Sequence, residues 1–276
     1  MFCITMQITN STTSFTSRNI DIRRAGDIVR HAKKVVPHFN PTYALENWKI
    51  LDVSKGGSFF KRTSFYSKFE KLISKMRQEY GAESAKNPTF YFDLFDKVKS
   101  KRLGNCYEKA YLTLGTLFSN GYNSAMKVGL EMELGAYDKA SGKCIATKII
   151  PIDHTAVLST MNNPNRTEID KTIVLDGWLN KAMTVSEAKK EYERFVSKRR
   201  IEAELQELQN ELRRKFRSPM QNRFLQTSNS QFDINNYEFR KSIEFLEDRR
   251  FSTEEARTFG EEISKKYPEI KLNSIV

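Results

Sequence analysis

The stretch Gly-Asn-Cys-Tyr-Glu at residues 104–108 opens an apolar helical run, and it decides how the rest of the chain is interpreted. Asn105 is a residue type favoured at helix N-caps, and Glu108 stands three positions after it, as in a capping box. We therefore predict a helix that begins at Cys106. Apolar residues follow the cysteine at helical spacing, at Ala110, Leu114 and Leu117.

The position of Cys106 suits a reactive thiol. A cysteine is a useful nucleophile only as its thiolate, which a helix N-terminus or a nearby imidazolium stabilises. The unpaired N–H groups of the first helical turn favour an anion, and they can also hold a developing oxyanion. We expect the backbone N–H of Cys106 to be such an oxyanion donor.

The hydrophobic period changes from helical to alternating after an expected helix stop at Asn120-Gly121. Residues 126–134 alternate apolar and polar side chains and predict a half-buried strand. A turn-rich segment at 135–142 predicts a hairpin into a second strand, over 144–158. A third strand is expected over 172–178. The order is therefore helix, strand, strand, strand, which predicts an α+β fold.

Two polar residues on these strands complete a candidate catalytic triad with Cys106. His154 shares the apolar face of the second strand, where an unpaired imidazole would be costly, so it requires a partner. Asp176 comes at the end of the third strand and can supply that partner. Asp153 is the weaker alternative, because it points to the opposite face from His154.

The other residues of these types are expected to be structural. Cys3 lies in a polar tail and Cys144 at a strand start, where a free thiol is a small apolar side chain. His31 and His38 are interpreted as structural or solvated histidines. Three cysteines without regular spacing predict neither a disulfide framework nor a zinc site, which is typical of a reducing compartment. We expect no metal and no cofactor.

The order Cys106, His154, Asp176 on a helix followed by antiparallel strands resembles the papain-like and transglutaminase-like cysteine enzymes. Gly104 to Glu108 resembles the helix start in their bacterial toxin and effector branch, which includes glutamine deamidases, and Asp176-Gly177-Trp178 is similar to their Asp-Pro-Trp strand end. The likeness covers about residues 100–180. One feature departs from it, because residues 97–103 hold no counterpart of papain's oxyanion glutamine.

The resemblance implies a nucleophile helix packed on an antiparallel sheet and a thiol hydrolase that acts on a protein. It favours deamidation of a host-protein glutamine. A cysteine protease or a transglutaminase with the same triad is the alternative within the enzymes. The alternative from another class is a non-catalytic basic adaptor that binds an acidic partner or a membrane.

The chain of 276 residues has a net charge of +12 and is expected to divide into four parts. We predict a disordered tail over 1–20, a basic helical part over 21–100, the catalytic core over 101–180 and a helical appendage over 181–276. The Ser/Thr-rich tail resembles the leaders of effectors injected into host cells and lacks the features of a secretory signal peptide. We therefore expect a bacterial effector delivered to a host cytosol, with a cytoplasmic protein as the alternative. No apolar run approaches the ~20 residues of a membrane-spanning helix.

The flanks carry most of the excess charge. Basic and apolar side chains interleave at helical spacing over 61–77, which favours a surface helix packed on the core; contact with an anionic membrane or an acidic partner is the alternative. No motif for specific nucleic-acid binding accompanies the charge. In the appendage we predict helices from Thr184 to about Arg217, from Tyr237 to Arg250, and from Thr253 to Lys266.

Overall fold

The structure is a computed structural model that describes residues 20–35, 71, 74, 75, 77–79, 88–101, 104–160, 172–217 and 233–272. The predicted tail over 1–20 lies outside these residues except for Ile20. The basic helix predicted over 61–77 is described only at residues 71, 74, 75 and 77, which are helical.

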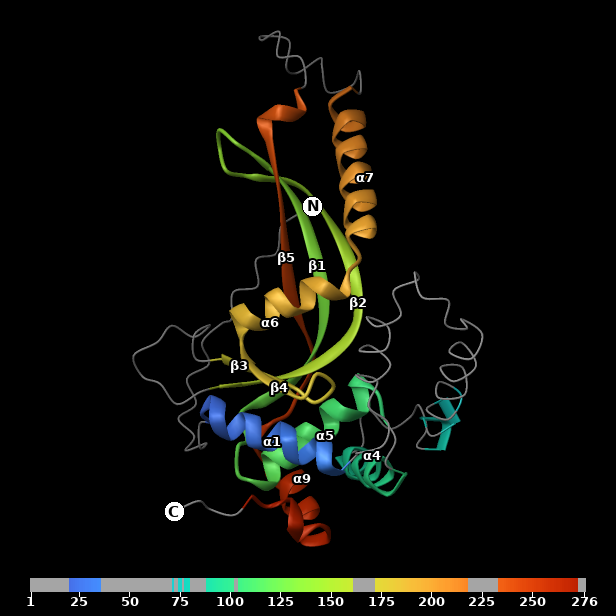
Figure 1. Ribbon diagram of the computed structural model, residues 1–276, viewed down its shortest axis with the longest axis vertical. Helices are drawn as coiled ribbons and strands as arrows, with labels where there is room; N and C mark the ends of the chain where they lie inside the picture. The colour runs from blue at the N-terminus through green and yellow to red at the C-terminus, as the bar shows by residue number, and fades with distance from the viewer. Residues whose placement is uncertain are drawn as a thin grey trace, which may run out of the picture. The chain divides into compact units, whose positions relative to one another are not determined.

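The protein has an α+β fold built on one antiparallel sheet, as predicted (Figure 1). The described strands are β1 (Ala125–Asp138), β2 (Cys144–Thr160), β3 (Thr172–Asp176), β4 (Lys181–Thr184) and β5 (Tyr237–Arg250). Their order in the sheet is β4-β3-β2-β1-β5. Strand β2 pairs with β3 in a register that sets Val157 opposite Leu175 and Ser159 opposite Ile173.

The described helices are α1 (Ile22–Val35), α4 (Pro88–Lys101), α5 (Cys106–Ser119), α6 (Val185–Tyr192), α7 (Lys198–Arg217) and α9 (Thr253–Lys266), with short 3₁₀ turns between some of them. The chain divides into two compact units. The first contains Leu130–Asp153 and Glu187–Leu246, and the second contains Thr16–Gly129, His154–Ser186 and Glu247–Val276. The boundary falls within β1, β2 and β5.

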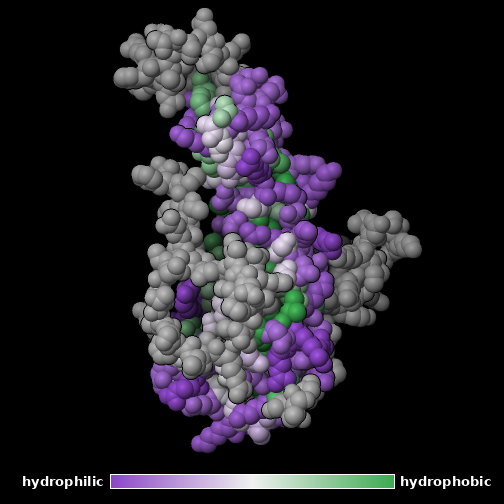
Figure 2. Space-filling model, turned by 90° about the vertical axis from the view of Figure 1, so that its left-hand side faces the viewer, coloured by the Kyte–Doolittle hydropathy of each residue, from purple (hydrophilic) through white to green (hydrophobic). Residues whose placement is uncertain are grey.

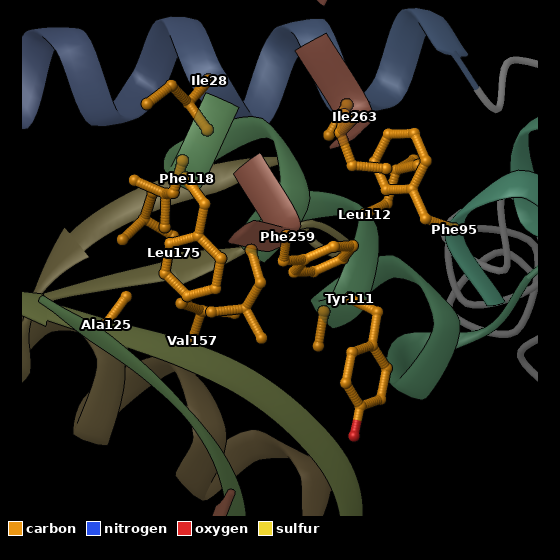
Figure 3. Close-up of a cluster of buried hydrophobic side chains, with 14 of the residues drawn as sticks. Ile28, Phe95, Tyr111, Leu112, Phe118, Ala125, Val157, Leu175, Phe259 and Ile263 are labelled. Atoms are coloured by element: carbon orange, nitrogen blue, oxygen red, sulfur yellow. The ribbon is translucent and has the colours of Figure 1, made fainter. Parts of the chain in front are cut away.

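Helix α5 is the centre of the second unit, where α1, α4 and α9 pack against it and strand β3 contacts it (Figure 1). Every residue of α5 from Glu108 to Ser119 is buried. Its buried side chains meet those of the neighbouring helices and strands in one cluster, of which Figure 3 labels Ile28, Phe95, Tyr111, Leu112, Phe118, Ala125, Val157, Leu175, Phe259 and Ile263. Burial of this apolar surface holds the first turn of α5 in a fixed place.

The ends of α5 agree with the sequence. The helix begins at Cys106 and its C-cap is Asn120, followed by Gly121 with φ of +80°. A left-handed residue just after a helix favours glycine, because a Cβ would be strained there. The predicted stop at Asn120-Gly121 is therefore confirmed.

The first unit contains the outer parts of the long strands and the helices α6 and α7. Lys148 on β2 forms ion pairs with Glu204, Glu207 and Glu211, which lie one helical turn apart along α7. Leu208 and Leu212 of the same helix are buried. One face of α7 is thus attached to the sheet by both charge and apolar contact.

Two predictions for the C-terminal flank are wrong. Tyr237–Arg250 forms strand β5 and not a helix, because it pairs with β1 at the edge of the sheet, where the spacing of its aromatic and β-branched residues at 237, 239, 243 and 245 is compatible with a strand. The run from Thr184 is also interrupted. Val196 has an extended backbone and Ser197 accepts hydrogen bonds from the first turn of α7, so a new helix begins there. The helix over Thr253–Lys266 and its capping box at Ser252 are confirmed.

Candidate active site

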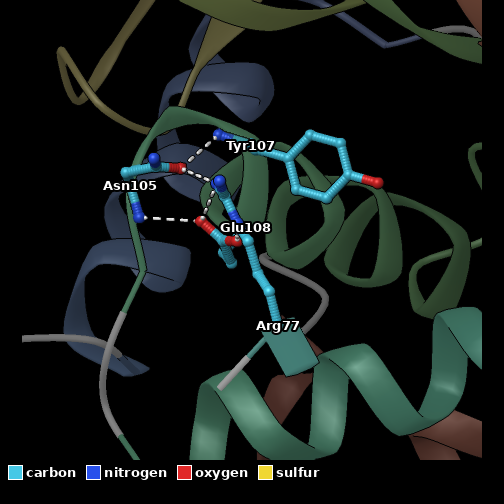
Figure 4. A network of polar contacts seen from close by, with 4 residues as sticks. All are labelled: Arg77, Asn105, Tyr107 and Glu108. Atoms are coloured by element: carbon cyan, nitrogen blue, oxygen red, sulfur yellow. Dashed lines mark hydrogen bonds and ion pairs between the residues drawn. The ribbon is translucent and has the colours of Figure 1, made fainter. Parts of the chain in front are cut away.

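The capping box at the start of α5 holds the segment around Cys106 in place. The backbone N–H of Asn105 donates to Glu108 Oε2 at 3.0 Å, and the N–H of Tyr107 donates to Asn105 Oδ1 at 3.0 Å (Figure 4). These bonds satisfy donors that a helix start leaves unpaired. The sequence prediction of this cap is confirmed.

Arg77 forms further hydrogen bonds to the capping residues, and nothing in the sequence indicated these contacts. Its Nε donates to Glu108 Oε1 at 2.7 Å, and its Nη2 donates to Asn105 Oδ1 at 3.1 Å (Figure 4). The Glu108 side chain is fully buried, so this carboxylate needs the guanidinium as its counter-charge. The contact joins the end of the predicted basic segment to the cysteine-bearing turn.

Cys106 is the first residue of α5 and is partly buried. Its side chain lies close enough to the imidazole of His154 to help raise the pKa of that histidine. Within the described part of the chain, its backbone N–H donates no hydrogen bond. A free N–H at a helix start beside a sulfur can donate a hydrogen bond to a developing oxyanion.

His154 lies on the buried face of β2, with 4% of its surface exposed. Its Nε2 is 2.6 Å from Asp176 Oδ2, so Nδ1 is the ring nitrogen that remains available to Cys106. Burial alone would lower the pKa of His154, but the charge and hydrogen bond of Asp176 and the contact with Cys106 raise it to about 10. The imidazolium is therefore the favoured form at neutral pH.

Asp176 ends β3 and is fully buried. Its Oδ1 accepts the backbone N–H groups of Trp178 at 2.9 Å and Leu179 at 2.8 Å, and its Oδ2 faces His154. Both carboxylate oxygens are thereby fixed. A Cβ on Gly177 would lie 2.8 Å from Thr113 Oγ1, so glycine lets the end of β3 approach α5 closely.

The structure brings together Cys106, His154 and Asp176, the three residues proposed from the sequence. The alternative acid, Asp153, is exposed, as expected for the opposite face of β2. Cys144 lies on β2 and its Sγ contacts the carbonyl oxygen of Ala146 at 3.6 Å. His31 lies on α1, while Cys3 and His38 are outside the described residues.

Two further side chains border the site. The Trp178 ring centroid is 5.2 Å from that of His154, and the tryptophan is only partly buried. Lys127 on β1 lies in electrostatic range of Cys106 and is almost fully buried. The alternating pattern of residues 126–134 predicted that the Lys127 side chain would be exposed to solvent. That prediction is wrong for Lys127, because the side chain is buried.

Among the described residues, no group of three or more histidine, cysteine or acidic side chains is arranged to hold a metal ion. A helix long and apolar enough to cross a membrane is also absent from the described segments. No family model, curated protein or solved structure matches the chain.

Proposed function

We propose that the protein is a cysteine amidohydrolase with a papain-like or transglutaminase-like core, acting on a protein substrate. One observation carries the proposal. A thiol at the start of a buried helix lies beside an imidazole whose Nε2 is 2.6 Å from a buried carboxylate. This is the arrangement of nucleophile, base and orienting group that thiol hydrolases require.

The first half of the reaction forms a thioester. His154 holds the proton of Cys106, and the thiolate adds to the carbonyl carbon of a carboxamide to form a C–S bond. The carbonyl electron pair moves to oxygen, where the Cys106 N–H stabilises it. When the intermediate collapses, the C–N bond breaks and the imidazolium protonates the departing ammonia or amine. Asp176 keeps the imidazole in its orientation throughout.

The second half releases the product. His154, now neutral, takes a proton from water as the water oxygen adds to the thioester carbon. The C–S bond then breaks, and the sulfur leaves as the thiolate beside the imidazolium. The net reaction converts a carboxamide and water to a carboxylate and ammonium, or an amide bond to its acid and amine.

Among carboxamides, we propose a glutamine side chain of a host protein as the substrate, with the enzyme delivered to the host cytosol as a bacterial effector. The support is the resemblance of Gly104 to Glu108 and of Asp176-Gly177-Trp178 to the effector deamidases. A protease would use the same triad with a peptide bond as substrate. A transglutaminase would differ only in the acceptor of the acyl group.

The test is a mass measurement on candidate host proteins after incubation with the enzyme. We expect a gain of about one dalton per modified glutamine, the amide-to-acid difference, without new fragments. The variant Cys106→Ala should produce no change. Discrete fragments that depend on Cys106 would favour the protease, and no Cys106-dependent product of any kind would favour a non-catalytic adaptor.

A further inference from the structure

Lys127 is a lysine held inside the protein beside the candidate site. It lies on β1 with 1% of its surface exposed, and it forms an ion pair with Asp248 on β5. The Asp248 side chain is about half exposed, at 49%. A buried ammonium is costly unless it is paired, so a purely structural position would favour an apolar residue of similar size.

Two tyrosine rings fix the ammonium at the start of α5. Its Nζ lies 4.0 Å from the ring centroid of Tyr107 and 5.0 Å from that of Tyr111. Tyr107 directly follows Cys106, and both rings belong to the first turns of the nucleophile helix. Cation–π contacts of this length stabilise a positive charge in one place. The charge is therefore held against side chains from the first turns of α5.

Several charged or ionisable groups around Lys127 affect the pKa of its ammonium group. The pKa of this lysine is lowered overall, because burial outweighs the hydrogen bond and charge of Asp248 and the effects of Cys106 and Glu108, which act to raise it. Glu108 is already paired with Arg77. Asp248 is thus the counter-charge of Lys127, and Cys106 is the group near it whose thiolate form the ammonium would favour.

We propose that Lys127 is the charge-stabilising side chain of the site, which favours the anionic sulfur of Cys106 and the oxyanion formed from the substrate carbonyl. This inference rests on the proposed function. It assigns to Lys127 the oxyanion-stabilising role that a glutamine has in papain, because residues 97–103 contain no glutamine. The ammonium transfers no proton. Asp248 and the two tyrosines are positioning residues, because they act by holding the ammonium.

The experiment compares two alkylating reagents on Cys106. Iodoacetate is anionic and iodoacetamide is neutral, so the ratio of their rates on one thiol reports the local charge. We expect Lys127→Met to lower this ratio by at least about threefold at low salt, and Lys127→Arg to retain it, because the ratio follows the Coulomb interaction. A loss of packing would change both rates together and leave the ratio unaltered.

The controls make each outcome decisive. Lys148→Met, a matched loss of an ion-paired strand lysine on β2, should leave the ratio at the wild-type value. Asp248→Asn should raise the ratio, since it removes the competing negative charge, and this expectation applies even if Lys127→Met does not fold. An unchanged ratio in Lys127→Met or in Asp248→Asn overturns the inference. If wild-type Cys106 reacts no faster than Cys144, the proposed function itself fails.

Discussion

A histidine enclosed between a carboxylate and a thiol is the residue that links the three members of the candidate triad. His154 is almost fully buried, yet its pKa is raised because Asp176 supplies a negative charge at 2.6 Å and Cys106 adds to this effect. Burial of a charge is tolerated only when it is paired in this way. The His154–Asp176 pair therefore belongs to the buried core, and its imidazole is the group that can hold a proton in the candidate site.

This pairing predicts a pH-dependent stability. The pKa of His154 is about 10 in the folded protein and about 6.5 in the unfolded chain. Its contribution to stability is thus fully present below pH 6.5 and is lost as the pH rises through about 10. We expect the urea-derived free energy of unfolding to fall between pH 6.5 and 9.5 by about 2–4 kcal/mol more in the wild type than in His154→Gln. Equal pH dependence in both proteins would show that His154 is not held as a cation.

The sequence allowed the triad to be predicted because each member carries a local signal. Cys106 follows a recognisable cap, His154 lies on an apolar strand face and Asp176 ends a strand before glycine. Lys127 carried no such signal. Its partner, Asp248, lies far along the chain, in a strand whose pairing is set by tertiary contacts. Arg77 and Glu108 are also brought together only by the fold, because they stand 31 positions apart in the sequence.

At the scale of elements, two helices begin with the same motif and only one carries a thiol. Helix α5 starts with a capping box from Asn105 to Glu108, and α9 starts with one from Ser252 to Glu255. Both boxes satisfy backbone donors that would otherwise be unpaired. The two helices therefore provide a matched comparison between the structural and the chemical role of a cap.

We predict that Asn105→Ala and Ser252→Ala each lower the free energy of unfolding by about 1 kcal/mol, the usual cost of losing a cap. Only Asn105→Ala should also slow the alkylation of Cys106, because only that cap sets the first turn around the thiol. Chemical unfolding and alkylation rates measure the two effects separately. Equal alkylation rates in the two variants would mean that the cap of α5 serves stability alone.

Elements with a clear period or cap could be predicted, and those decided by distant contacts could not. The ends of α5, the cap of α9 and the strands β1 to β3 follow from local pattern. Strand β5 was mistaken for a helix because its many Glu, Lys and Arg residues are also typical of exposed helices. Its pairing with β1 decides the outcome, and that contact joins residues more than a hundred positions apart.

At the scale of the whole molecule, the chain is basic and its described surface is largely polar. Figure 2 shows a face on which hydrophilic residues predominate among those described, with small hydrophobic patches. Only Ile22, Ile149 and Leu246 are exposed large hydrophobic residues in the described segments. Recognition of a protein partner by this surface would therefore depend strongly on charge.

Helix α7 is the element on which we expect partner selection to depend. Its glutamates pair with Lys148, while Arg199, Arg200 and Arg214 are exposed and Arg213 is partly exposed. Reversing these four charges to glutamate should weaken capture of the substrate protein, most at low salt, and leave the alkylation of Cys106 unchanged. Binding assays at several ionic strengths measure the first effect. Substrate turnover that is unaltered at every ionic strength would assign partner selection to another surface.

If Cys106 is an activated thiol, its alkylation rate at pH 6 should exceed that of the other two cysteines. With peptide-resolved mass spectrometry after limited iodoacetamide treatment, we expect Cys106 to react at least about tenfold faster than Cys3 and Cys144, because it alone faces an imidazolium at a helix start. His154→Ala should remove most of this advantage. Equal rates for the three thiols in the wild-type protein would contradict the account.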